Sequence, residues 1–186
     1  MSKNFKILLF FFLCLNFASS SNAQYLENNP KPSQRVFYGG DLGFSFGYST
    51  YISVNPIVGY RITNRLSSGI GLNYTFAKSN YYGYIGNMFG GNIFASFTIV
   101  KDLGNIISFY QGSGILFYAE YNLMDVSHYY SVPGREVKYV ASPMAGFAFQ
   151  SPISNRSYLL IMVLYNFNET SISPYPNPVI KFSYQF

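Results

Sequence analysis

His128, the single histidine, is the residue whose type points most directly to chemistry. Glu120, Asp125 and Ser127 lie close to it along the chain, and a histidine with a serine and an acid can perform acyl transfer or hydrolysis. Such a triad needs a hydrogen bond between nucleophile and base, which neighbours on one loop do not form unless the fold brings them together. We therefore interpret His128 as an exposed loop histidine and keep catalysis at this residue as an alternative.

Other kinds of chemical site find little support in the sequence. One histidine cannot build a histidine-based metal site, and no cluster of carboxylates replaces it. The phosphate-binding pattern Gly-x-x-x-x-Gly-Lys-Ser/Thr is absent, although glycine is frequent. The 12 basic residues exceed the 7 acidic ones but form no run, which argues against nucleic acid as a partner. We expect no catalytic residue, no cofactor and no metal.

Three charged residues, Asp41, Arg61 and Lys181, occupy positions where small or polar residues alternate with large apolar ones. Asp41, for example, alternates with Leu42 and Phe44. Successive side chains of a strand point to opposite faces, so the three charges share the face away from the large residues. Unpaired charges away from bulk water are costly, so we expect a structural cluster of paired charges. A binding or proton-relay cluster is the alternative.

The composition indicates which elements position these residues. Charged residues make up 10% of the chain and aromatic residues 20%, whereas an ordinary soluble domain has about 25% charged residues. After residue 23 no apolar stretch approaches the roughly 20 residues of a membrane helix. A closed β-barrel is the remaining way to satisfy every backbone group in lipid. The fold class we expect is all-β, a transmembrane up-and-down antiparallel barrel.

The N-terminus has the features of a secretory signal. Lys3 and Lys6 precede an apolar run over 7–15, and small residues up to Ala23 offer a cleavage site. A membrane anchor would need a run about twice as long. A lipoprotein signal at Cys14, the only cysteine, is the weaker alternative because the bulky Leu13 precedes it. We predict a signal peptide over 1–23, a flexible periplasmic segment over 24–34 and a barrel over 35–186.

The rest of the chain divides into stretches of about ten residues separated by turn-rich connections, which is typical of membrane barrels. Eight strands are more consistent with the pattern than ten. We place them at 36–48, 52–62, 67–78, 88–100, 106–120, 137–150, 157–168 and 178–186. An even number of strands puts both termini on the periplasmic side. Tyrosines near the predicted strand ends, among them Tyr60, Tyr118 and Tyr139, would form aromatic girdles.

The last strand carries the most specific motif, in which Ile180, Phe182 and Tyr184 alternate up to a final Phe186. It resembles the terminal strand by which outer-membrane barrels engage their assembly machinery. The segment 57–71 (IVGYRITNRLSSGIG), and the predicted barrel as a whole, resemble the small outer-membrane β-barrel proteins common in Bacteroidetes and, more distantly, the OmpA/OmpX type. The resemblance implies the fold, an outer-membrane location, and partners in outer-membrane lipid and the barrel-assembly machinery.

The expected function follows from the narrowness of such a barrel, whose interior is just wide enough for side chains to fill. We expect a non-enzymatic envelope protein with a structural or surface-interaction role, whose extracellular partner these residues do not identify. A narrow channel or a carrier of a small apolar ligand is the first alternative. Some small outer-membrane barrels modify lipids, so a lipid-modifying enzyme using His128 is the second. A soluble lipocalin-like barrel is disfavoured by the low charge.

The register of the first hairpin predicts how the three charges meet. If the hairpin turns around 49–51, Asp41 faces Gly59, and Arg61 is its diagonal neighbour. Closure of the barrel places Lys181, five residues from the C-terminus, at a similar depth to Asp41. We therefore expect Asp41 to bridge Arg61 and Lys181.

Overall fold

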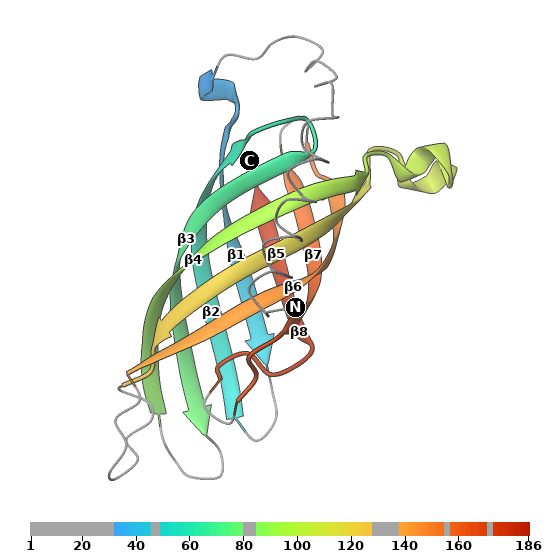
Figure 1. Ribbon diagram of the computed structural model, residues 1–186. Coiled ribbons are helices and arrows are strands. Elements are labelled where there is room, and N and C mark those ends of the chain that lie inside the picture. Colours follow the sequence, from blue (N-terminus) through green and yellow to red (C-terminus); the bar gives the residue numbers. More distant parts are fainter. Residues whose placement is uncertain (1–31, 46–48, 80–84, 128–137, 155–156, 171–172) are drawn as a thin grey trace, which may run out of the picture.

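The computed structural model describes residues 32–45, 49–79, 85–127, 138–154, 157–170 and 173–186. They form eight antiparallel strands that pair in chain order and close into a barrel where β8 meets β1 (Figure 1). The strands are β1 (Val36–Ser45), β2 (Ser49–Arg61), β3 (Leu66–Ser79), β4 (Ile85–Val100), β5 (Gly114–Asp125), β6 (Tyr139–Pro152), β7 (Tyr158–Asn166) and β8 (Val179–Gln185). The prediction of an eight-stranded up-and-down barrel is confirmed.

The two ends of the barrel differ in what they carry (Figure 1). At the end where β1 begins and β8 ends, here called the terminal end, lie the 3-10 helix η1 (Pro32–Gln34) and the short connections after β2 and β6. The opposite end, here called the loop end, carries the segment between β7 and β8. The predicted signal peptide lies outside the described residues, as does the 24–31 part of the predicted flexible segment. None of the described helices is long and apolar enough to cross a membrane.

The alternation read from the sequence sets the two faces of the barrel wall. Large side chains such as Leu42, Ile70 and Phe182 are 46%, 64% and 42% exposed and point outward. Asp41, Asn73 and Ser183, one residue away in each strand, are buried and point into the lumen. The apolar β7, whose facing the pattern left open, buries alternate residues from Leu160 to Asn166. The rule of period two therefore decides the facing of every strand.

The connection between β4 and β5 departs from the prediction. Residues 106–113, expected to begin the fifth strand, instead belong to a projection with two 3-10 helices, η2 (Leu103–Asn105) and η3 (Ser108–Tyr110) (Figure 1). The Asp102 carboxylate accepts hydrogen bonds from the backbone N–H groups of Gly104 and Gly112, both at 2.8 Å. These bonds close the connection on itself, so β5 starts at Gly114 and its centre moves toward the loop end.

Packed side chains fill the lumen at both ends. Toward the terminal end, Phe37, Phe94 and Tyr118 form a continuous aromatic series, with ring centroids 6.3 and 5.6 Å apart. The Phe37 ring lies over Gly59, its partner on β2, where any side chain would overlap it. Toward the loop end the buried side chains are again apolar and include Ala77, Met88, Met124, Val126 and Val140. The polar side chains lie between these two apolar regions.

Candidate functional site in the barrel lumen

A belt of buried polar side chains crosses the middle of the lumen, with contributions from every strand. We call it the polar belt; its members are Asp41, Asn55, Asn73, Asn92, Glu120, Asn122, Ser142, Asn166, Lys181 and Ser183, each no more than 5% exposed. Each belongs to the inward set of its strand, so alternation alone brings it inside. The inward position of Asp41 and Lys181, predicted from the sequence, is confirmed.

An ion pair between β5 and β8 joins two members of the polar belt. The Lys181 ammonium donates to Glu120 Oε1 at 2.7 Å, and the same oxygen accepts a hydrogen bond from Asn122 at 3.1 Å. The ammonium also lies 5.2 Å from the centre of the Tyr175 ring. Because both charged side chains are nearly inaccessible, each ion has lost its hydration, and the charge of its partner compensates for that loss. Lys181 is therefore a fixed positive charge.

The expected bridge from Asp41 to Arg61 and Lys181 is not formed. Among the described residues, the pair between Lys181 and Glu120 is the only one within salt-bridge distance. Asp41 instead accepts a hydrogen bond from the Asn55 amide at 2.7 Å. The Arg61 guanidinium lies over the Phe37 ring, 5.5 Å from its centroid, toward the terminal end. The cluster predicted from the sequence therefore loses Arg61, and Lys181 has a different partner.

The register of the first hairpin explains this correction. β2 already begins at Ser49, so Asp41 faces Asn55 rather than Gly59. Arg61 is six residues beyond Asn55, about 20 Å along the strand. The error in register is an even number of residues, so it moved partners along the strand without turning a side chain to the other face.

Part of the segment between β7 and β8 folds back over the loop end of the lumen. Asn166 holds this strap, residues 173–178, by donating to Ser173 Oγ and to the Tyr175 carbonyl oxygen, both at 2.9 Å. Asn177 donates to the Asn166 carbonyl oxygen, also at 2.9 Å. Tyr175, only 5% exposed, inserts its ring into the lumen, where its hydroxyl accepts a hydrogen bond from Asn122 at 3.0 Å. Burial raises the pKa of Tyr175 because an ionised phenol would lose its hydration, so the hydroxyl stays protonated.

In the described part of the chain, several amide and hydroxyl atoms of the lumen have no hydrogen-bond partner. They are Asn55 Oδ1, Asn73 Nδ2, both amide atoms of Asn92, Asn122 Oδ1 and Ser142 Oγ. Buried polar groups are normally met by ordered water or by a ligand. The polar belt is therefore a chamber with hydrogen-bonding capacity to spare.

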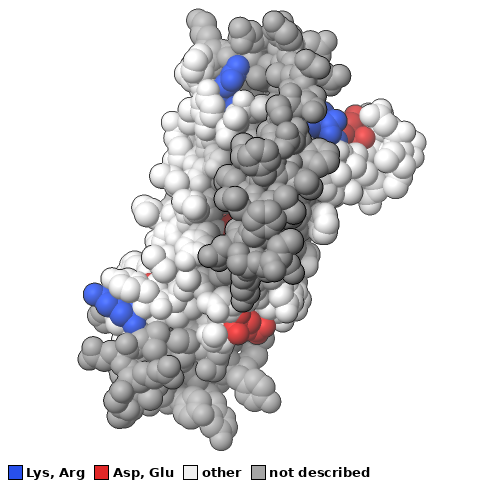
Figure 2. Space-filling model, viewed as in Figure 1, with Lys and Arg blue, Asp and Glu red and all other residues white. Residues whose placement is uncertain are grey.

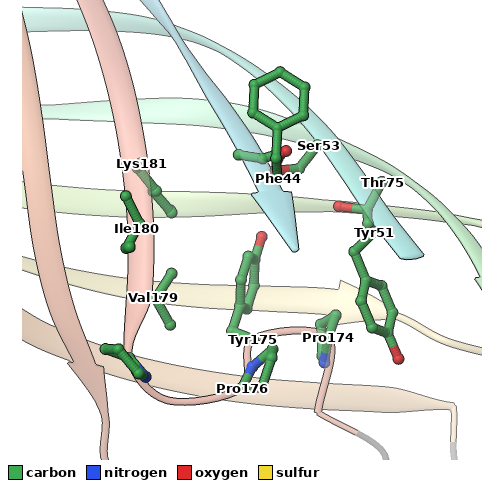
Figure 3. Close-up of a pocket in the computed structure, with 12 residues that line it drawn as sticks. Phe44, Tyr51, Ser53, Thr75, Pro174, Tyr175, Pro176, Val179, Ile180 and Lys181 are labelled. Atoms are coloured by element: carbon green, nitrogen blue, oxygen red, sulfur yellow. Dashed lines mark hydrogen bonds between the residues drawn. The ribbon is translucent and has the colours of Figure 1, made fainter. Parts of the chain in front are cut away.

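A cavity of about 300 Å³ opens beside the belt, at the loop end of the contact between β1 and β8 (Figure 3). Figure 3 shows its walls: Lys181 and Ile180 on β8, Phe44 at the end of β1, and Tyr51 and Thr75 on the far side. The strap passes across it with Pro174, Tyr175 and Pro176. The cavity thus combines an apolar, aromatic lining with a buried ammonium and a hydroxyl.

The C-terminal motif lies on the outer face of β8. Ile180, Phe182 and Tyr184 are 42–45% exposed, as the alternation predicted. Phe186 closes the barrel at the terminal end, where its backbone N–H and C=O exchange hydrogen bonds with Tyr38 at 2.9 and 3.0 Å. Whether these residues act as an assembly signal stays a prediction.

One of the remaining sequence predictions concerns a residue outside the described part of the chain, and two concern residues that the structure places inside the lumen. His128 lies outside the described residues, so the catalytic alternative stays a prediction. The sequence places Glu120 near His128, but in the structure it forms the ion pair of the lumen with Lys181. Tyr118, assigned to an outer girdle, is 1% exposed and stacks on Phe94 inside. The alternation Tyr118, Glu120, Asn122 carried the signal, but the misplaced start of the fifth strand concealed it.

Comparison with known proteins gives no match, either to a protein-family model or to a curated protein sequence. In the described part of the chain, no three His, Cys, Asp or Glu side chains gather as a metal site would need.

Proposed function

We propose that this protein is a small outer-membrane β-barrel, exported by a signal peptide cleaved after residue 23, with a structural or surface-interaction role and no catalytic activity. The family of small barrels common in Bacteroidetes, of the OmpA/OmpX architecture, is part of this proposal. One observation carries it: the outer face is apolar in the middle of all eight strands, while the buried charges Asp41, Glu120 and Lys181 lie inside the barrel. Exposed apolar side chains in the middle of the strands include Leu42, Val54, Ile70, Ile93, Leu123, Phe147, Val163 and Phe182.

An apolar belt of this extent favours lipid as its surroundings, because soluble proteins rarely expose a contiguous apolar patch beyond a few hundred Å². In the view of Figure 2, the coloured charged residues gather near the two ends of the barrel, and the described surface between them is almost entirely uncharged. This distribution fits the two interfaces and the apolar middle of a bilayer.

The filled lumen favours a non-conducting barrel over the channel alternative. The aromatic series of Phe37, Phe94 and Tyr118 occupies the terminal half, and the strap with Tyr175 covers the loop end. In the described part of the chain, side chains thus occupy both ends of the lumen, which argues against a continuous path for solutes. The cavity beside Lys181 favours a second candidate function, the binding of a small amphiphile, within the same barrel.

The test is fractionation and reconstitution. We expect the mature chain in the outer-membrane fraction, with an electrophoretic mobility that changes on boiling. In planar bilayers we expect no steady conductance above that of the lipid alone. Recovery in the soluble periplasmic fraction without detergent would contradict the location, and a stable single-channel current would favour the channel alternative.

A further inference from the structure

The seam between β1 and β8 is the shortest strand pairing of the barrel. Five residue pairs join the two strands, Gly39–Gly43 with Lys181–Gln185, and Tyr38 bonds to Phe186 just beyond the end of β8. In the same register, Phe44 would face Ile180, but these two residues are not paired, although β1 continues to Ser45 and β8 begins at Val179. The ladder between the two strands therefore ends at Gly43 and Lys181, one residue pair before the position at which Phe44 would face Ile180.

The cavity of about 300 Å³ lies at the loop end of this seam, and residues of both faces of the barrel wall line it (Figure 3). Phe44 and Ile180, 46% and 45% exposed, belong to the outer face, yet both line it. Thr75 and Lys181, 1% and 3% exposed, line the same cavity from inside the barrel. The cavity therefore reaches from the inside of the barrel to the outer face at the loop end of the seam, which makes this place a lateral entrance.

The strap makes access from the loop end less direct. Pro174, Tyr175 and Pro176 line the cavity on that side, and the Tyr175 hydroxyl is bonded to Asn122 on β5. The strap is fastened to β7 through Asn166. A ligand therefore reaches the cavity between β1 and β8.

The lining specifies the chemistry of the ligand. At about 30 Å³ for a water-sized group, the cavity has room for roughly ten such groups. Its entrance is apolar, whereas its inner part is lined by Lys181 and Thr75, whose ammonium and hydroxyl groups are hydrogen-bond donors. Glu120 already neutralises Lys181, and Asp41 adds another carboxylate to the belt, so a second anion is disfavoured. The matching head group is an uncharged hydrogen-bond acceptor.

We propose that the cavity binds a free single-chain amphiphile of about ten carbons, with an ester, amide or alcohol head directed to Lys181 and Thr75 and its tail toward Phe44 and Ile180. This inference rests on the proposed membrane location, because the amphiphile enters the cavity from the lipid. A bilayer phospholipid does not fit the same orientation, since its head stays at the membrane surface while the polar end of the cavity lies inside the barrel.

The open seam is tested with cysteine pairs. Cys14 lies in the predicted signal peptide, so an introduced pair is the only one in the mature chain. Leu42 and Phe182 are partners across the seam and both point outward, so a Leu42→Cys/Phe182→Cys variant forms a disulfide on mild oxidation. The Phe44→Cys/Ile180→Cys variant, two residue pairs closer to the strap and beyond the last pair of the ladder, forms none but is joined by a longer bifunctional reagent. Equal disulfide yields in the two variants would show a closed seam and overturn the proposal.

Binding is tested by fluorescence, which the absence of native tryptophan makes specific. Tyr51→Trp places a reporter in the cavity wall, and Phe97→Trp, on the outward face of β4, is the control. In phosphatidylcholine vesicles, methyl 10-bromodecanoate should quench Tyr51→Trp with saturation and Phe97→Trp in linear proportion to its concentration. Thr75→Val in the Tyr51→Trp background should weaken the saturable quenching by the ester roughly three- to tenfold, and leave quenching by 1-bromodecane unchanged.

The outcomes separate this inference from the proposed function. Quenching of Phe97→Trp by brominated phosphatidylcholine reports insertion into the bilayer, and its absence would contradict the membrane location and this inference together. If insertion occurs but the ester quenches Tyr51→Trp only linearly, the cavity binds no amphiphile and the inference alone fails. Saturating quenching of Tyr51→Trp by the brominated phospholipid would assign the cavity to a bilayer lipid chain and overturn the free amphiphile.

Discussion

Replacing Lys181 with methionine tests the ion pair that crosses the lumen. Methionine has a similar length but carries no charge, so Lys181→Met leaves the Glu120 and Asp41 carboxylates, 4% and 3% exposed, without a cation in the polar belt. Removing one member of a buried ion pair costs about 3–5 kcal/mol, because the other charge stays buried and unpaired. We therefore expect the free energy of unfolding to fall by about 4 kcal/mol.

The partner variant and the double variant make this a cycle. Glu120→Gln keeps an oxygen next to Lys181 and Asn122. The two charges that remain, on Lys181 and Asp41, have opposite signs, so we expect the free energy of unfolding to fall by only about 1–3 kcal/mol. The Lys181→Met/Glu120→Gln double variant should be more stable than Lys181→Met alone, because neither charge of the pair is left. The coupling free energy between the two positions should be about 2 kcal/mol or more.

The assay is urea unfolding of the barrel refolded in lipid vesicles, followed by circular dichroism of the β-sheet and by the mobility of unboiled samples. At a slope of about 2 kcal/mol per molar urea, a loss of 4 kcal/mol moves the midpoint by about 2 M. Arg61→Met is the matched control, because it removes a cation that lies on Phe37 outside the polar belt. When Arg61→Met is combined with a second variant, Asp41→Asn, their effects on the free energy of unfolding should be additive within about 0.5 kcal/mol. Equal destabilisation by Lys181→Met and by the double variant would refute the reasoning.

Three further changes probe the packing, the strap and the end of the chain. Gly59→Ala should lower the free energy of unfolding by about 1–3 kcal/mol, because the added methyl overlaps the Phe37 ring. Gly40→Ala, whose methyl would meet only atoms 3.6 Å away or farther, is the control, and equal melting temperatures for the two would contradict the packing argument. Asn166→Ala removes the bonds that hold the strap and should speed proteolytic cleavage between β7 and β8 in the folded barrel, which cleavage kinetics on unboiled protein measure; an unchanged rate would show that Asn166 does not hold the strap. Phe186→Asp should lower the yield of assembled barrel in outer membranes while signal cleavage stays normal, whereas Phe186→Leu should assemble; normal yield of the Asp variant in immunoblots of membrane fractions would exclude the assembly role.

The alternation of side chains carries most of what sequence alone determined about the wall of the barrel. Leu42 faces outward and Asp41 inward because the backbone turns successive side chains to opposite faces, whatever the neighbouring strands do. The low charge and the regular spacing of turns predicted eight spans, and the structure has eight. These properties are local, since each depends on a few consecutive residues and on the solvent they avoid.

The contacts inside the lumen were decided only by the tertiary structure. Lys181 meets Glu120, 61 residues earlier in the chain, because closure of the barrel brings β8 across the lumen from β5. Asp41 does not contact Arg61 because β2 begins at Ser49, and this start sets the register of every residue pair in the hairpin. The face to which a side chain points depends only on the position of its residue in the alternation of its own strand. The partner that it meets across the barrel depends on the registers of all the strand pairs between the two residues. An error at one turn therefore leaves the faces intact and still changes which charges meet.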